Sequence, residues 1–117
     1  PVVALNQAVA VAEAGDLSRA LAMLTPLAAA LSAYQPFHAA RAELLVRAGK
    51  FADSVAAYDQ ALETLPNLPA SLYGRGLARL ALGDVGGQQD VDRAKALDIH
   101  ASENFAVFEA RHPRPYA

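Results

Sequence analysis

Three glycines recur at one fixed interval along the chain, at Gly15, Gly49 and Gly83. Each one follows a run rich in alanine and leucine, and each is followed by a charged residue. A period between about 20 and 50 residues is typical of repeat proteins, in which each repeat is one supersecondary unit stacked on its neighbours. We therefore expect an all-α fold built from three antiparallel helix pairs.

The glycines have a local role as well as a regular spacing. A glycine just beyond a helix end can adopt the left-handed conformation that satisfies the last carbonyl groups. Asp16 and Asp84 come directly afterwards and are candidate N-caps for the next helix. If Gly49 uses that conformation, its replacement by valine should cost about 1 kcal/mol or more.

The first helix of each unit should precede its glycine. The expected helices cover Val2 to Ala14, Pro36 to Ala48 and Ala70 to Leu82. Each of them carries a small residue at the same repeat position, where the two helices of a pair should touch: Ala8, Ala42 and Gly76.

The second helices follow the glycines and carry one apolar face. Spacings of three and four positions trace that face in the first unit, at Ala20, Leu24, Leu27 and Leu31. The equivalent positions of the second unit are Ser54, Tyr58, Ala61 and Leu65. Pro66 then ends the second unit, because proline cannot continue a helix.

Two irregularities interrupt this pattern. Pro26 falls inside the second helix of the first unit and should kink it. The third unit is one residue short near Gly86 and Gly87, and its second helix is expected from about Gln88 to Leu97. A capping helix is expected at about 102–111, through Phe105 and Phe108, before a tail at 112–117.

Composition excludes several classes of protein. The net charge of −2 gives no polycation for nucleic acid, and the absence of cysteine removes disulfides and thiolate metal sites. No apolar run reaches the ~18 residues of a membrane span, and a secretory signal is missing. The absence of cysteine fits a reducing compartment, so we expect a cytoplasmic protein. Because the chain begins Pro1-Val2 rather than with methionine, we also expect it to be a fragment of a longer protein.

The glycine interval matches the period of about 34 residues that is typical of the tetratricopeptide repeat (TPR), and the pattern resembles that family across essentially the whole chain. This resemblance implies a single domain over residues 1–117, with repeats at about 1–34, 35–68 and 69–100. It also implies that the three helix pairs form a right-handed superhelix closed by the C-terminal capping helix.

A narrower resemblance covers about residues 1–65. The stretches Val2 to Gly15 and Phe37 to Leu45, followed by Gly49, Ala57-Tyr58 and Ala61-Leu62, are similar to the C-terminal extension of a group of bacterial extracytoplasmic-function RNA polymerase sigma factors. The resemblance implies regulation through protein contacts, with the N-terminal sigma domains of the same chain or RNA polymerase as partners. The second half, around Leu72 to Leu80, departs from that group, and its DNA-reading elements have no counterpart here.

The TPR resemblance also implies where a partner would bind. In this family the first helices line the concave face, and its groove positions correspond to Leu5, Val9, Ala12, Glu13, Ala39, Glu43, Val46, Arg47, Tyr73, Leu77, Leu80 and Ala81. Such a largely apolar groove would suit an amphipathic protein or peptide helix, with Glu13, Glu43 and Arg47 at its rim. The groove could also be filled by the chain's own terminal segment.

Catalytic chemistry is not indicated. No histidine stands at a metal-ligand spacing on a shared helix face, so we predict no catalytic, cofactor-binding or metal residues. His38 is expected to be packed or solvated, and Asp90 and Asp92 are expected to be solvated. The segment Gly74-Arg75-Gly76 is expected to be a close crossing between helices rather than a phosphate loop.

Arg41, Arg75 and Arg79 could align into a basic strip, since the first two occupy equivalent repeat positions. A strip of this kind could bind an acidic peptide or helix, or nucleic acid. Alternatively, Glu43 and the aspartates of the second helices could neutralise it. We expect neutralisation. We also expect no direct nucleic acid binding, because such binding needs several unpaired phosphate contacts and the net charge is slightly negative.

Three functional hypotheses follow. The first is a protein-interaction module of a sigma factor that acts in transcription regulation. The second is a TPR scaffold or adaptor unrelated to transcription, binding an amphipathic helix or peptide. The third, an enzyme, has no motif in its favour.

Overall fold

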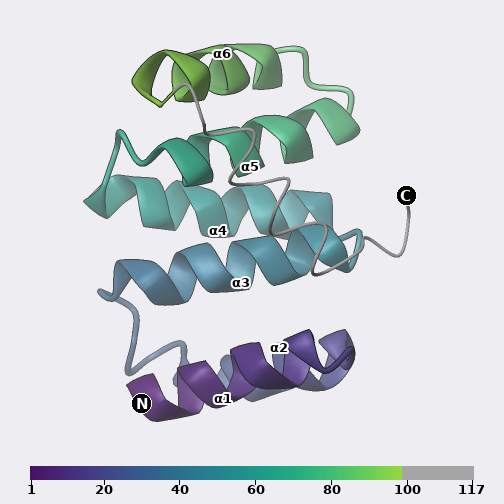
Figure 1. The fold of residues 1–117 in the computed structure, drawn as a ribbon, viewed down its shortest axis with the longest axis vertical. Helices are drawn as coiled ribbons and strands as arrows, with labels where there is room; N and C mark the ends of the chain where they lie inside the picture. Colours follow the sequence, from purple (N-terminus) through teal and green to yellow (C-terminus); the bar gives the residue numbers. More distant parts are fainter. Residues whose placement is uncertain (99–117) are drawn as a thin grey trace.

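The computed structural model describes residues 1–98, and this part of the chain is all-helical. Its elements are α1 (Val2–Glu13), α2 (Leu17–Leu24), the 3₁₀ helix η1 (Thr25–Leu27), α3 (Gln35–Arg47), α4 (Phe51–Thr64), α5 (Pro69–Ala81) and α6 (Gly87–Leu97). The helices stack along the long axis, with α1 and α2 at one end and α6 at the other (Figure 1). Each α-helix packs against the next one in the sequence.

The three spaced glycines all adopt the left-handed conformation, with φ of 103° at Gly15, 77° at Gly49 and 83° at Gly83. At the first, the Gly15 N–H donates to the Ala12 carbonyl at 3.0 Å and the Asp16 N–H to the Val11 carbonyl at 3.2 Å. The same pair of bonds follows α3 and α5. These are Schellman caps, so the predicted role of the glycines is confirmed.

Helix positions agree with the sequence-based expectation to within one residue for α1, α3, α5 and α6. The Asp16 side chain caps α2 as expected, because its Oδ1 accepts the Arg19 N–H at 3.1 Å. Asp84 behaves differently: its Oδ1 accepts the Gly86 N–H at 2.9 Å, while α6 itself starts after Gly86.

Pro26 has a larger effect than the expected kink. The α-helix ends at Leu24, and Pro26 lies in the short 3₁₀ helix η1. Proline lacks an N–H and its ring collides with the carbonyl four residues earlier, so a regular α-helix cannot continue through it. The second helix of the first unit is therefore much shorter than α4.

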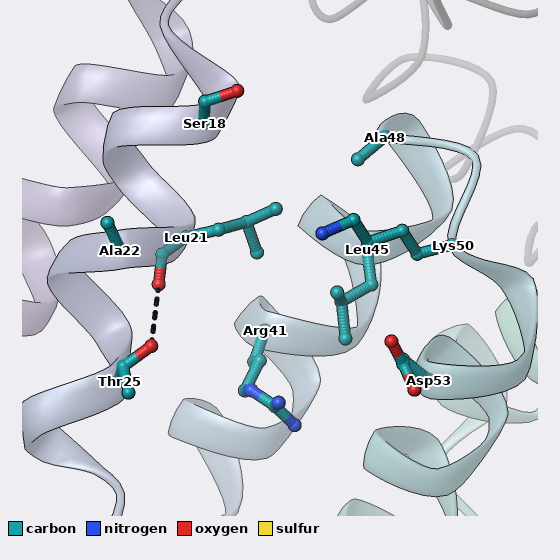
Figure 2. A pocket seen from close by; sticks show the side chains of 9 residues that line it. All are labelled: Ser18, Leu21, Ala22, Thr25, Arg41, Leu45, Ala48, Lys50 and Asp53. Carbon is teal, nitrogen blue, oxygen red and sulfur yellow. Dashed lines mark hydrogen bonds between the residues drawn. The ribbon is translucent and has the colours of Figure 1, made fainter.

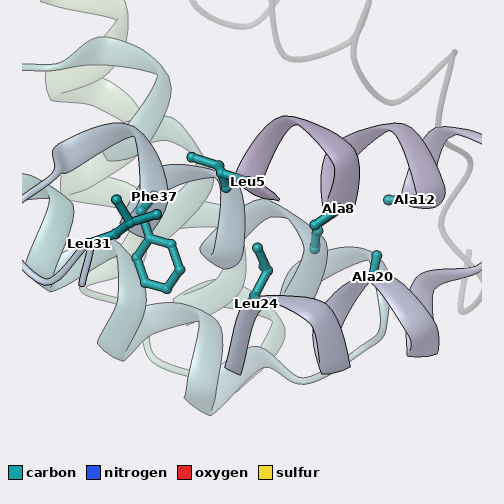
Figure 3. Packing of buried hydrophobic residues seen from close by; sticks show 8 residues of the cluster. Leu5, Ala8, Ala12, Ala20, Leu24, Leu31 and Phe37 are labelled. Atoms are coloured by element: carbon teal, nitrogen blue, oxygen red, sulfur yellow. The ribbon is translucent and has the colours of Figure 1, made fainter. Parts of the chain in front are cut away.

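The apolar core runs through the stack as three successive clusters. The first joins α1 and α2 to Leu31 and to α3 (Figure 3). Its buried members are Leu5, Ala8, Ala12, Ala20, Leu24, Leu31, Phe37 and Leu44. The second joins α3, α4 and α5, and the third joins α4, α5 and α6. The predicted small residues Ala8, Ala42 and Gly76 are all buried. Leu65 is the exception among the expected core columns, since it is 45% exposed.

Two glycines of α5 allow close approach by neighbouring helices. The Tyr58 ring of α4 occupies the space that a Gly74 side chain would need. A Cβ on Gly76 would lie 2.7 Å from the Gly87 carbonyl oxygen of α6. The predicted crossing at Gly74-Arg75-Gly76 is thereby confirmed. The expected capping helix, with Phe105 and Phe108, and the expected tail lie outside the described residues.

Candidate functional site

The residues predicted for the groove all lie on α1, α3 and α5, and contacts join α1 to α3 and α3 to α5. Four of them are buried: Leu5, Ala12, Val46 and Arg47. Five are half-buried: Val9, Ala39, Glu43, Tyr73 and Leu77. Three are exposed: Glu13, Leu80 and Ala81. We call the half-buried and exposed members the inner-helix surface, because a partner could reach only these.

A charged group lies where α1 and α3 meet. Arg47 is only 4% exposed, so the expectation that it stands at the rim is wrong. Its Nη2 reaches the Ala12 carbonyl oxygen of α1 at 3.4 Å, near the negative end of that helix dipole. Glu43 lies one turn before Arg47 on α3, and Glu13 also acts electrostatically on the guanidinium. Arg47 therefore lies beneath the inner-helix surface, where its positive charge acts on the carboxyl groups of Glu43 and Glu13.

Burial strongly affects the ionisation of this pair. It raises the pKa of Glu43 from 4.5 to about 7, although the nearby Arg47 acts in the opposite direction. Burial also lowers the pKa of Arg47, while Glu43 and Glu13 act to raise it. The Glu43 carboxyl therefore changes charge near neutral pH, which makes the inner-helix surface sensitive to pH in that range.

The α5 part of the inner-helix surface is more apolar. Tyr73 and Leu77 are half-buried and lie one turn apart, and Leu80 is 37% exposed. A helix face with an aromatic and two leucines can bury apolar area against a partner. The acidic residues of the inner-helix surface thus lie on α1 and α3, whereas its α5 residues are all apolar or aromatic.

The three arginines of the possible basic strip differ in whether aspartates pair with them. Arg75 makes a bidentate pair with Asp90, with Nε–Oδ2 and Nη2–Oδ1 distances of 2.8 Å, and its Nη1 lies 2.9 Å from Asp59 Oδ1. Arg79 pairs with Asp84 at 2.9 Å and with Asp90 at 3.0 Å. Neutralisation by aspartates is therefore confirmed for these two arginines.

Asp90 is correspondingly not solvated, and that expectation is wrong. It is 7% exposed and accepts hydrogen bonds from both arginines. Burial alone would raise the pKa of Asp90, but the bonds from Arg75 and Arg79 outweigh it and hold the pKa below its usual value. Asp92 is exposed, as expected, and its Oδ1 accepts a bond from Gln88 at 2.9 Å.

Arg41 differs from the other two arginines. Within residues 1–98 it makes no hydrogen bond or ion pair, and it lines two hollows between the first helix pair and the rest of the stack. One hollow has a volume of about 430 Å³ and includes Thr25, Lys50 and Asp53 (Figure 2). The other, of about 280 Å³, includes Thr25 and His38. We call these two hollows together the Arg41 groove.

His38 is packed, as expected. It is buried edge-on against Phe37, with ring centroids 5.2 Å apart, and its Nε2 lies 2.6 Å from the Ser32 carbonyl oxygen. This bond ties the start of α3 to the segment that follows η1. The Nδ1 atom is buried without a hydrogen-bond partner among residues 1–98.

The described part of the chain offers neither a metal cluster nor a membrane span. Residues 1–98 contain no group of three or more histidine, aspartate or glutamate side chains that could hold a metal ion. None of the helices described is long and apolar enough to cross a membrane.

Comparison with known proteins gives limited information. No family model matches the chain, and no solved structure matches it. A relative described as an uncharacterized protein, from Rhizobium meliloti (strain 1021), is 39% identical over 75 residues, which is 64% of this chain. The matched segment makes up only 18% of that relative, so the chain spans a small part of the length of the curated protein it matches.

Sequence reasoning missed the Arg41 groove, although the repeat held a signal for it. The equivalence of Arg41 and Arg75 is visible in the sequence, whereas the carboxylate partners of Arg75 lie on other helices. An alignment of the charged columns places Thr25 of the first unit opposite Asp59 of the second, one full repeat later. That comparison would have marked Arg41 as an arginine whose expected acidic neighbour is missing.

Proposed function

We propose that this chain is a TPR-like protein-interaction module, forming a right-handed superhelix, in the C-terminal regulatory part of a cytoplasmic bacterial RNA polymerase sigma factor. The observation that carries the repeat assignment is the set of three Schellman caps at the evenly spaced Gly15, Gly49 and Gly83. Each cap joins the two helices of one pair. Supporting it, the equivalent small residues of the three units are buried where the helices of a pair meet.

Binding rather than catalysis is the activity that this arrangement supports. The inner-helix surface offers the apolar Tyr73 and Leu77 on α5, and the carboxyl groups of Glu13 and Glu43 on α1 and α3. An amphipathic helix can place its apolar side on the former and basic residues near the latter. The partner would be the preceding sigma domains of the same protein or RNA polymerase, with no direct contact to nucleic acid or membrane.

The sigma-factor assignment has a separate basis from the repeat assignment. It rests on the resemblance of residues 1–65, while the curated relative shows that a similar segment exists within a much longer protein. Two sigma-type helical domains before this segment in the whole protein would support the assignment. Their absence would leave the scaffold or adaptor alternative.

A double variant of the whole protein tests the binding surface. We expect Tyr73→Ala with Leu77→Ala to weaken co-purification with RNA polymerase and to alter transcription from a cognate promoter. The matched control is Leu65→Ala with Val85→Ala, two exposed apolar residues away from the inner-helix surface. Equal loss in both double variants, or no loss in either, would contradict partner binding on α5.

A further inference from the structure

Arg41 and Arg75 occupy the same position in successive repeats, but only one of them is neutralised. Arg75 has two carboxylate partners, Asp59 on the preceding helix α4 and Asp90 on the following helix α6. Arg41 has none within residues 1–98. The surroundings of Arg75 in the third unit thus show what encloses such an arginine when it is paired.

The residues that replace those two aspartates around Arg41 cannot carry a charge. Thr25 is the counterpart of Asp59, since the same full repeat separates them. Once the single-residue deletion before α6 is allowed for, Ala57 is the counterpart of Asp90. Neither counterpart offers a carboxylate, so the Arg41 guanidinium keeps its hydrogen-bond donors available for another acceptor.

The space for that acceptor is present. Arg41 and Thr25 both line the hollow of about 430 Å³ and the hollow of about 280 Å³. In Figure 2 Arg41 on α3 is seen between Thr25 on one side and Asp53 of α4 on the other. α2 ends at Leu24, before Pro26, and the segment that follows lines the smaller hollow through Ala28 and Ser32.

We propose that the Arg41 groove binds a carboxylate side chain of a partner polypeptide, which takes the place of the missing aspartate. Lys50 adds a second positive charge against the single negative charge of Asp53, so the groove favours an anion. Leu21 and Leu45 supply apolar walls. The two hollows share Arg41, so an extended chain can lie across both while its acidic residue meets the guanidinium.

This site is separate from the inner-helix surface. Arg41 and Leu45 follow one face of α3, whereas Glu43 and Arg47 follow the opposite face, given about 3.6 residues per turn. The proposal therefore does not require a partner on the inner-helix surface. Variants of the two surfaces can fail or succeed independently.

The test uses the full-length protein and two short leucine-containing peptides, one with a single central glutamate and the other with glutamine there. A charge-assisted bond predicts that the wild type binds the glutamate peptide roughly tenfold or more tightly than the glutamine peptide. In the Arg41→Gln variant this preference should disappear. Lys95→Gln, an exposed change on α6, controls for the loss of one positive charge.

A second pair of variants tests whether a carboxylate introduced at Thr25 pairs with Arg41 and so competes with the peptide. Thr25→Asp should pair with Arg41 as Asp59 pairs with Arg75, and so weaken glutamate-peptide binding by a similar factor while raising the melting temperature. Thr25→Asn should do neither. Because Arg41 makes no hydrogen bond or ion pair within residues 1–98, Arg41→Gln should keep the wild-type circular dichroism spectrum.

Several results would overturn the proposal. Equal affinity for the two peptides, or an unchanged preference in Arg41→Gln, would show that the guanidinium does not recognise the carboxylate. Free glutarate binding as tightly as the glutamate peptide would assign the site to a small diacid instead of a polypeptide. No stabilisation by Thr25→Asp would show that Arg41 is not placed to receive a carboxylate there.

Discussion

Gly76 of α5 and Gly87 of α6 face each other at backbone contact. A Cβ on Gly76 would lie 2.7 Å from the Gly87 carbonyl oxygen, and a Cβ on Gly87 would lie 2.5 Å from the Gly76 carbonyl oxygen. Distances below 3.0 Å are essentially never seen for real Cβ atoms, and here the obstacle is backbone rather than a movable side chain. The third helix pair is therefore held at a separation that only glycine permits.

Gly87→Ala should lower the stability of the protein for this reason. We expect the free energy of unfolding to fall by about 3 kcal/mol, because α6 must move away from α5 and lose packing. Urea denaturation followed by circular dichroism measures the change. Gly86→Ala is the matched control, since its Cβ would meet only the flexible ends of the Arg79 and Asp84 side chains. Equal losses in the two variants would contradict the backbone-contact explanation.

The Schellman cap at Gly83 predicts a smaller effect of a different origin. Nothing lies within 4 Å of a Cβ built there, but its φ of +83° is unfavourable for residues with a side chain. Gly83→Ala should cost about 1 kcal/mol, and Gly83→Asn should cost less because asparagine tolerates this conformation better. Melting temperatures of the two variants provide the comparison. An asparagine variant no more stable than the alanine variant would argue against strain at this position.

The period and the helix faces could be predicted from the sequence because each depends on local chemistry. Gly15, Gly49 and Gly83 had to end helices, and small residues such as Ala42 had to stand where helices cross. The sequence predicts a kink at Pro26, but the α-helix ends at Leu24. A helix can either kink or end at proline, and packing decides between the two.

The charged contacts could not be predicted in the same way. Asp90 lies 15 residues from Arg75 and 11 from Arg79, so no helical spacing indicates their pairing. Arg47 was assigned to a rim because its repeat position faces inward, but its reach to the Ala12 carbonyl depends on how closely α1 and α3 pack. Such contacts join separate helices and become visible only with the tertiary structure.

Asp90 should be the main electrostatic support of the third helix pair. Asp90→Asn removes the carboxylate shared by Arg75 and Arg79, and we expect a loss of about 2 kcal/mol at pH 7. Asp92→Asn, an exposed change on the same helix, should have little effect. Chemical denaturation at pH 7 compares the two variants, and equal losses would contradict this role for Asp90.

The lowered pKa of Asp90 adds a pH dependence at acid pH. Because the folded-state pKa lies below the ordinary value of 3.8, its stabilisation is present above pH 3.8 and is lost as the pH falls through the folded-state pKa. The Asp90→Asn variant should lack this acid-dependent loss. An unchanged acid-unfolding profile in Asp90→Asn would contradict the assignment to Asp90.

Glu43 gives a pH dependence of the opposite sign at higher pH. Its pKa rises from 4.5 to about 7 on folding, so the folded state holds a proton that the unfolded chain has released. Stability should therefore be highest below pH 4.5 with respect to this group, and should fall as the pH rises to about 7. After allowance for solvent at a half-buried site, the loss is about 2 kcal/mol.

Glu43→Gln imitates the protonated form, so it should match the wild type at pH 4.5 and exceed it in stability at pH 8. Denaturation at both pH values measures this difference, with Glu63→Gln on the exposed side of α4 as the control. A Glu43→Gln variant that is no more stable than the wild type at pH 8 would show that the carboxylate is stabilised by Arg47 more than burial disfavours it.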